Sequence, residues 1–444
     1  MSVNRQKRLS WVLVSVLVLT VLAACNNSNE AGKEKATEAD KAEEINLKFI
    51  WWGKEQRKED TLKVIELYKK DHPNVNIETE DFGGTNDVST QLAMETADQN
   101  TADIIQGDYG FIFNYINRDL IEPLGPHIEN KNLSIADVSP ATLAPGMKDN
   151  ELYAVSIGIN SEALLYDPAF FEKEGVEVPA MDYTLDDLYK TLVQLKEAVN
   201  EPDFYPLGNM FDVSYYLRAK GVSMYNAEGT GLGYEDDKYL EEYLALYKKW
   251  VDEGLISSGS TKRAGNDADH PLITGKAALY SVSSNASTLL SKIAGRTLQL
   301  LPLPEVTKGI EGKFIKPSMF LAVSSYSKHP EEAAKFIDFF INNKEANGIL
   351  NGERGVPVSG VIAKRLSDKL DEAGKQQYEL LDYLSTHSAP IDPPAPSSSI
   401  VVNNAYQLIL KRVMSGTTAP AKAAQDYRTE AEGILQGKKG AESK

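Results

Sequence analysis

Few residue patterns in this 444-residue sequence support covalent chemistry. It contains no Gly-x-Ser-x-Gly nucleophile motif, no Walker phosphate loop and no His-Glu-x-x-His zinc motif. Residues 325–328 (Ser-Tyr-Ser-Lys) fit a Ser-x-x-Lys pattern, but its companion motifs are missing, so we expect a loop before a helix. Residues 229–233 (GTGLG) follow no strand and indicate a turn. We therefore expect no catalytic residues.

Metal chemistry is equally poorly supported. Asp267 and Asp269 could offer oxygen ligands, but the glycine and distal glutamate of a calcium loop are absent, which favours a solvated loop. The five histidines are far apart in the sequence, and a zinc site would have to be assembled from distant segments. They are His72, His127, His270, His329 and His387. We expect neither a metal nor a cofactor.

Recognition of a sugar is better supported, because a sugar site needs flat apolar faces and planar polar side chains. Trp51 and Trp52 end an apolar run, and strand alternation directs one into the core and the other toward an opening. Trp52, beside Gly53 and the charged residues that follow, is the better candidate for the opening; the alternative places both in the core. Residues 106–109 (Gln-Gly-Asp-Tyr) follow another predicted strand, where open α/β sheets bind ligands.

The elements that must position these residues alternate between strand and helix. Residues 45–52 predict a buried strand, 60–71 a helix, and 75–80 a second strand. This order predicts an α/β fold with a parallel or mixed sheet. Tyr215, Tyr216 and Trp250 lie on helical faces and are expected in the core.

Two long extended segments, residues 152–166 and 314–323, predict crossings between two lobes. Each lobe is then discontinuous in sequence: an N-lobe of residues 45–157 plus 322–360, and a C-lobe of residues 158–321 plus 361–437. A body joined by more than one hinge strand can close around a ligand. Residues 389–399 (APIDPPAPSSS) must be extended, because proline fixes φ and lacks the amide donor.

The N-terminus predicts export. Arg5, Lys7 and Arg8 precede a short apolar run, which identifies residues 1–24 as a signal peptide. Residues 22–25 (Leu-Ala-Ala-Cys) resemble a bacterial lipobox, which implies lipid attachment at Cys25, the only cysteine. Residues 25–44 are polar and predict a flexible tether. We expect the protein at the outer face of the cytoplasmic membrane, bound to it through the lipid alone, and the net charge of −17 disfavours a nucleic-acid partner.

Several blocks together resemble the type 1 extracellular solute-binding protein family, the sugar-binding subunits of ABC importers that include maltose-binding protein. The blocks are the opening strand and helix and residues 102–106 (ADIIQ), 120–124 (LIEPL), 275–279 (GKAAL) and 354–358 (RGVPV). The segments WWGKEQR, FDVSYYLRAKG, NAEGTGLGYEDD, NGERGVPVSG and DPPAP resemble a subgroup that binds rhamnogalacturonan and other pectic oligosaccharides. The resemblance implies a two-lobe periplasmic-binding-protein type II fold, a hinge between discontinuous lobes, an oligosaccharide ligand, an ABC permease partner and a monomeric receptor.

Carried over by position, the family's ligand contacts fall on the strand ends and crossings. They are Trp52, Glu55, Arg57, Asp108, Tyr109, Asn160, Phe211, Asp212, Asn285 and Met319, the last beside Phe320. Asn285 stands where maltose-binding proteins carry an aromatic platform, which favours a more polar or acidic sugar. Lys54 and Arg57 could then meet a uronate carboxylate. Arg354 is expected to support the hinge from behind.

Two other functions remain open at this stage. The 64 acidic residues allow some paired carboxylates, so a secreted carbohydrate-active enzyme is one alternative. A receptor of the same fold for a non-sugar solute is the other.

Overall fold

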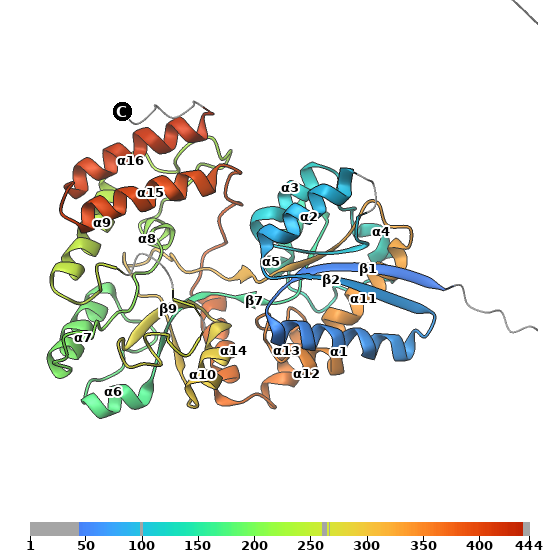
Figure 1. Cartoon of the computed structure of the whole chain (residues 1–444), viewed down its shortest axis with the longest axis horizontal. Helices are drawn as coiled ribbons and strands as arrows, with labels where there is room; N and C mark the ends of the chain where they lie inside the picture. Colours follow the sequence, from blue (N-terminus) through green and yellow to red (C-terminus); the bar gives the residue numbers. More distant parts are fainter. Residues whose placement is uncertain (1–43, 98–100, 260–263, 266, 438–444) are drawn as a thin grey trace, which may run out of the picture. The chain divides into compact units, whose positions relative to one another are not determined.

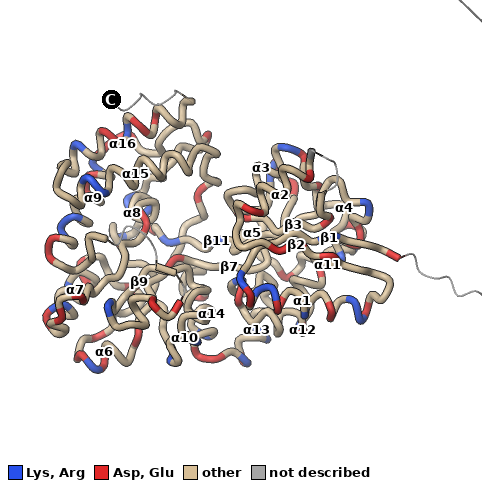
Figure 2. Tube along the Cα trace, viewed as in Figure 1, with Lys and Arg blue, Asp and Glu red and all other residues tan. Residues whose placement is uncertain are grey.

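A computed structural model describes residues 44–97, 101–259, 264–265 and 267–437 (Figure 1). The predicted signal peptide, Cys25 and all of the tether except its last residue lie outside these described residues. None of the helices in the described ranges is long and apolar enough to cross a bilayer. Figure 2 shows basic and acidic residues interspersed over the surface helices, not gathered in one basic stripe.

The first sheet has five strands in the order β2-β1-β3-β12-β6. β1 pairs in parallel with both β2 and β3, whereas β12 runs antiparallel to β3 and β6. The strands are β1 (Ile45–Trp52), β2 (Val75–Phe82), β3 (Ile104–Gly107), β6 (Val155–Ser156) and β12 (Phe320–Val323). The predicted mixed sheet is confirmed.

Alternation along β1 divides the core around this sheet. Phe49 and Trp51 pack into one apolar cluster with residues of α1 and α11, while Ile50 packs into another with α2 and α3. Figure 1 shows these two pairs of helices on opposite faces of the sheet. The helices are α1 (Glu55–Asp71), α2 (Thr85–Ala97), α3 (Tyr109–Asn117) and α11 (Pro330–Asn342). Helix α1 begins five residues before its predicted start, because its polar first turn has no apolar periodicity.

The second sheet has three antiparallel strands in the order β10-β8-β9. They are β8 (Glu162–Tyr166), β9 (Leu279–Ser283) and β10 (Gln299–Pro302). Its apolar clusters contain Tyr215, Tyr216 and Trp250, all buried as predicted. The helices around it include α7 (Leu185–Ala198), α8 (Val213–Arg218), α9 (Lys238–Asp252), α10 (Ala286–Ala294), α14 (Glu372–Thr386), α15 (Ser399–Met414) and α16 (Pro420–Leu435).

Two extended segments pass from one sheet to the other. The first leaves β6, forms β7 (Ile159–Asn160) and enters β8; the second forms β11 (Lys316–Pro317) and enters β12. β7 and β11 pair antiparallel. The remaining elements are α4 (Gly125–Glu129), α5 (Pro140–Leu143), η1 (Ala144–Gly146), β4 (Met147–Lys148), β5 (Glu151–Leu152), α6 (Pro168–Glu174), α12 (Lys344–Leu350) and α13 (Gly360–Ser367).

Candidate functional site

A cavity of about 790 Å³ lies where the carboxyl end of β1 approaches α10. Trp52 and the first turn of α1 form one wall, and a full face of α10 forms the facing wall. The end of α12, the loop containing Glu353 and the start of α14 complete the lining. The walls therefore come from both sheets, and the volume is within the range of small-molecule sites.

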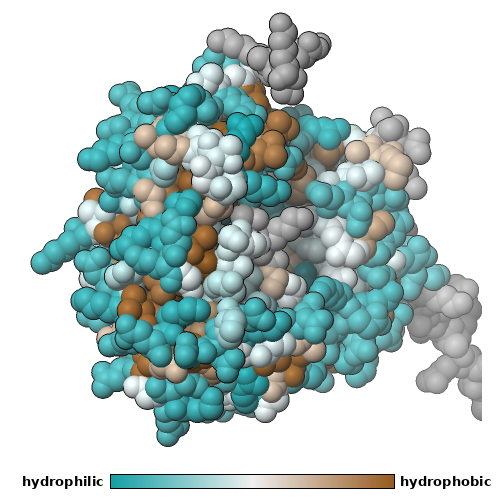
Figure 3. Space-filling model, turned by 60° about the vertical axis from the view of Figure 1, so that its left-hand side comes forward, coloured by the Kyte–Doolittle hydropathy of each residue, from teal (hydrophilic) through white to brown (hydrophobic). Residues whose placement is uncertain are grey.

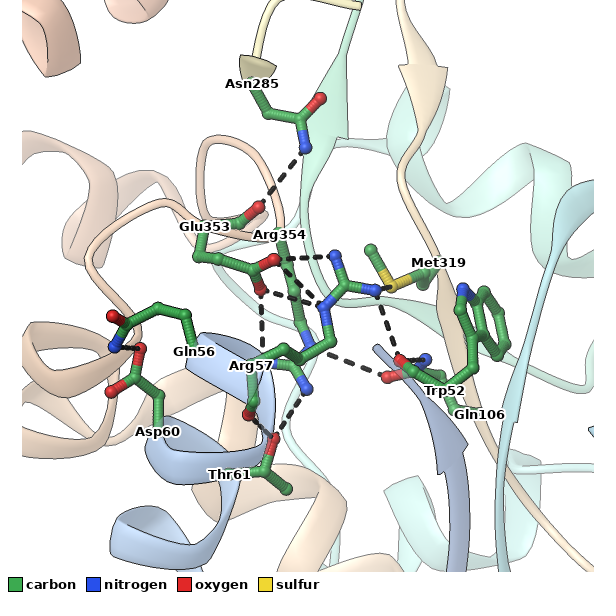
Figure 4. A network of polar contacts seen from close by, with 10 residues as sticks. All are labelled: Trp52, Gln56, Arg57, Asp60, Thr61, Gln106, Asn285, Met319, Glu353 and Arg354. Carbon is green, nitrogen blue, oxygen red and sulfur yellow. Dashed lines mark hydrogen bonds and ion pairs between the residues drawn. The ribbon is translucent and has the colours of Figure 1, made fainter. Parts of the chain in front are cut away.

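Arg57 is held by a carboxylate on the cavity wall (Figure 4). Its Nε donates to both carboxylate oxygens of Glu353 at 3.0 and 2.9 Å, and its Nη2 donates at 2.8 Å. Its Nη1 donates to the Trp52 carbonyl at 3.2 Å and to the Met319 sulfur at 3.4 Å. Every nitrogen of the guanidinium thus has a protein partner. In this structure Arg57 is therefore not an unpaired cation, as a direct contact with a uronate carboxylate would favour.

Arg354 lies behind this pair and is only 2% exposed. Its Nη2 donates to the Thr61 hydroxyl at 2.7 Å, and its Nη1 lies 3.6 Å from a Glu353 carboxylate oxygen. Its guanidinium also lies over the Phe340 ring, 5.4 Å from the centroid. These contacts fit the predicted supporting role, because Arg354 braces α1 and the Glu353 loop without lining the cavity.

Burial and neighbouring charges shift the pKa values of Glu353 and Arg354. Burial alone would raise the pKa of Glu353, but the hydrogen bonds and charge of Arg57, aided by Arg354, outweigh it and lower that pKa. Burial and the nearby charge of Arg57 lower the pKa of Arg354 to about 9, against the opposing attraction of Glu353. The cluster therefore stays fully charged at neutral pH, with two cations sharing one carboxylate.

Asn285 reaches this cluster from the segment that follows β9 of the second sheet. It is the N-cap residue of α10, and its Nδ2 donates to the Glu353 carbonyl at 3.2 Å. Trp52, on the opposite wall, is half-buried, whereas Trp51 is fully buried. This difference agrees with the prediction that Trp52 is the tryptophan nearer an opening.

Four predicted residues lie outside the cavity lining but remain near element ends. Asp108 caps α3 by accepting from the Gly110 amide at 2.8 Å, and Glu55 is exposed in the first turn of α1. The Tyr109 hydroxyl donates to the Asp392 carbonyl at 3.0 Å; burial, with the charge of Asp392, raises the pKa of Tyr109 to about 12. Asp212 caps α8 and is exposed.

Three further predicted residues are buried. Phe211 is fully buried against Tyr215 and Trp250, so in this structure its side chain serves the core and not a solute surface. Met319 is 6% exposed and meets the cavity only through Arg57. Asn160 is 4% exposed, and its Oδ1 has no hydrogen-bond partner among the described residues.

The position of Asn160 also explains why residue 355, beside the crossing strand, is a glycine. Gly355 has φ +100°, and a Cβ there would lie 2.4 Å from Asn160 Oδ1 and 2.6 Å from the Ile159 carbonyl oxygen. Only glycine allows both the left-handed backbone and this close approach. The crossing strand and the Glu353 loop are thereby packed against each other.

The cavity brings together Trp52, Arg57 and Asn285 from the predicted set. Sequence reasoning missed Glu353 and Lys292, which also line it. Glu353 stands beside the recognised Arg354, but no local pattern connects it with a helix 296 residues away. Lys292 is one exposed lysine among many in the sequence.

Metal ligands do not gather anywhere in the described ranges, where no group of three histidine, cysteine or acidic side chains could hold an ion. His270 is 1% exposed, and burial lowers its pKa to about 4 despite the opposing charge of Asp267. A buried neutral histidine of this kind is a core residue.

The family model described as bacterial extracellular solute-binding protein matches residues 53–347, which include most of the first sheet, all of the second and most of the cavity wall. This chain belongs to that family. A protein of Brucella abortus (strain 2308), named as a binding protein, is 24% identical over 335 residues, which are 73% of this chain and 78% of the relative. The predicted family is confirmed.

Solved structures agree with the fold of this extracellular solute-binding protein. A family 1 extracellular solute-binding protein from Alicyclobacillus acidocaldarius superposes with a TM-score of 0.74 at 28% identity, covering 89% of this chain and 100% of that one. A periplasmic oligogalacturonide binding protein from Yersinia enterocolitica, in complex with saturated digalacturonic acid, has a TM-score of 0.74 at 23% identity and the same coverage. The predicted periplasmic-binding-protein fold is confirmed.

Proposed function

We propose that this chain is a receptor for a pectin-derived oligosaccharide, which it captures between two lobes and delivers to an ABC import permease. The observation that carries the proposal is the cavity lined by Trp52, at the end of β1 in the first sheet, and by Asn285, at the start of the helix that follows β9 of the second. A solute there contacts both bodies at once, so its binding favours the arrangement that brings them together. No covalent step is required.

The lobes in this proposal keep their predicted bounds, residues 45–157 plus 322–360 and residues 158–321 plus 361–437. Pairing of β7 with β11 supports a hinge there, because these two short strands lie between the sheets. A monomer anchored through Cys25, outside the cytoplasmic membrane, completes the proposal. The permease would recognise the lobes in their ligand-bound arrangement.

The cavity lining supports a polar sugar. Asn285 offers an amide where an aromatic ring would suit a glucan, and Trp52 supplies one partly exposed ring for stacking. Thr288, Ser291 and Gln56 add further polar groups along the walls. The Yersinia protein is named for an oligogalacturonide, and its shared fold makes that ligand class the first to test.

A thermal-shift screen tests the proposal. Purified protein is heated with oligogalacturonides, rhamnogalacturonan oligosaccharides, maltodextrins and cello-oligosaccharides. A ligand at 100 times its Kd stabilises the folded protein by about 2.7 kcal/mol, which raises the melting temperature measurably. Stabilisation by a pectic oligosaccharide alone supports the proposal, whereas stabilisation by neutral glucans alone contradicts the ligand class.

One variant and its control test whether the ligand binds in this cavity. Trp52→Ala is expected to weaken binding about fivefold, because one aromatic stacking contact contributes roughly 1 kcal/mol. Tyr326→Ala, at an exposed aromatic outside the cavity, is the matched control and is expected to bind normally. Equal affinity in wild type and Trp52→Ala would remove the cavity wall from the proposed site. Shortened or unsaturated sugar products after incubation would indicate an enzyme instead.

A further inference from the structure

The acidic side chains on the cavity wall are all engaged by the protein. Asp60 accepts from Gln56 Nε2 at 3.0 Å and from Lys63 Nζ at 3.3 Å. Asp371 caps α14 by accepting from the Gly374 amide at 2.8 Å. Glu353 holds Arg57. Asp60 and Glu353 thus have cationic partners, whereas the exposed Asp371 is held only by a backbone amide.

The basic side chains divide into two kinds. Arg57 pairs with Glu353, and Arg296 Nε lies 2.6 Å from Asp167. Lys54 and Lys292 are exposed on the same lining and have no side-chain hydrogen bond or ion pair within the described part of the chain. The two lysines are therefore the unpaired cations of the described cavity lining, against one unpaired carboxylate, Asp371.

These lysines stand on facing walls. Lys54 precedes the first turn of α1, and Lys292 lies in the last turn of α10. Neither helix has a side-chain cap at its N-terminus, and the first turn of α10 contains no acidic residue. The α10 N-terminus, with its partial positive charge, reaches the lining at Asn285, one helix length from Lys292. The lining thus offers unpaired cations on both walls in a protein whose net charge is −17.

We infer that Lys54 and Lys292 select a solute that carries carboxylates, with one lysine on each wall. The inference rests on the proposed function and adds the residues that make the site prefer an acidic sugar over its neutral counterpart. Lysine suits this role because its ammonium is a mobile point charge that follows a carboxylate without fixed geometry. Arg57 is less suited to the role, because its guanidinium is already paired with Glu353.

Calorimetry with two matched sugars tests the inference. The probes are trigalacturonic acid and its fully methyl-esterified form, which keeps the rings and hydroxyls but has no charge. Wild type is expected to bind the acid at least tenfold more tightly at low salt. Lys54→Gln and Lys292→Gln are each expected to lose about tenfold for the acid, the equivalent of one charge-assisted contact. Binding of the ester is expected to change less than twofold.

Three controls make the result specific. Lys308→Gln changes an exposed lysine outside the cavity and is expected to bind both probes as wild type does. Lys54→Arg with Lys292→Arg keeps both charges and is expected to keep the preference for the acid. Added salt is expected to shrink the preference of wild type, because screening weakens exposed charge pairs. Melting temperatures confirm that each variant is folded.

The outcomes separate the inference from the proposed function. If wild type binds both probes equally, or if a double variant, Lys54→Gln with Lys292→Gln, still prefers the acid, the inference is overturned while oligosaccharide binding stands. If wild type binds neither probe and no sugar of the thermal-shift screen, both fail together. A preference lost only in the lysine-to-glutamine variants supports the inference.

Discussion

Two sets of charges share one cavity and differ in burial and pairing. Around Glu353, the charges of Arg57 and Arg354 are buried or half-buried and each lies within ion-pair distance of its carboxylate. Lys54 and Lys292 are exposed and have no such partner among the described residues. A paired, buried charge contributes to the arrangement of the chain, whereas an exposed, unpaired one remains available to a solute. Figure 3 shows that hydrophilic residues cover much of one face of the molecule, between smaller apolar patches, so polarity alone does not single out a binding residue there.

The largest effect is expected from Glu353→Gln. Without the carboxylate, the buried Arg354 and the neighbouring Arg57 repel each other, and the charge of Asp60 compensates only in part. Removing one partner of a fully buried pair costs about 3–5 kcal/mol, and we expect about 2 kcal/mol here because Glu353 is partly exposed. Urea unfolding measures the loss.

Glu430→Gln is the matched control, because Glu430 is exposed and has no ion pair among the described residues. We expect its unfolding free energy to stay within about 0.5 kcal/mol of wild type. Equal stability of Glu353→Gln and Glu430→Gln would mean that the Glu353 cluster does not stabilise the fold. It would contradict the assignment of a structural role to the paired charges.

His270 is a buried titratable group that stays neutral, in contrast to the buried, charged residues around Glu353. Its folded pKa of about 4 lies below the unfolded value near 6.5, so the unfolded chain takes up a proton first as the pH falls. Its contribution to stability is thus complete above pH 6.5 and is lost progressively toward pH 4. Between pH 7 and pH 5 we expect wild type to lose about 1–2 kcal/mol more than His270→Gln, measured by urea unfolding at each pH. Parallel pH profiles would contradict the prediction.

Particular residues show how far sequence reasoning reached. Strand alternation correctly separated buried Trp51 from half-buried Trp52, because a period of two is a local property of the chain. The pairing of Arg57 with Glu353 joins residues 296 positions apart, and only the fold brings them together. The resemblance predicted a ligand contact at Phe211, whereas the structure buries its side chain in the core; a family position defines the backbone and not the direction of a side chain.

Arg57→Met sharpens the division between the two sets of charges. The methionine keeps much of the aliphatic packing but leaves Glu353 with Arg354 as its one cationic neighbour among the described residues, so we expect a loss of about 1 kcal/mol in unfolding free energy. The ratio of affinities for trigalacturonic acid and its methyl ester should change less than twofold. A ratio that falls as far as in the lysine variants would show that Arg57, despite its partner, contacts the acid.

The smallest effect is expected from Tyr109→Phe, which tests a contact outside the cavity. The Tyr109 hydroxyl donates to the Asp392 carbonyl, and Arg218 also binds Asp392 through its carboxylate, so this proline-rich segment is held from two sides. Removing one neutral hydrogen bond costs about 0.5–1.5 kcal/mol, and the remaining Arg218 contact favours the lower end. Because the phenylalanine ring keeps its packing against Phe113 and Phe320, the change isolates the hydroxyl.

We expect affinities for the acid and the ester to fall by the same factor, below about fivefold, since the contact influences the arrangement of the chain and carries no charge preference. A loss confined to one of the two sugars would instead place the Tyr109 hydroxyl on the solute.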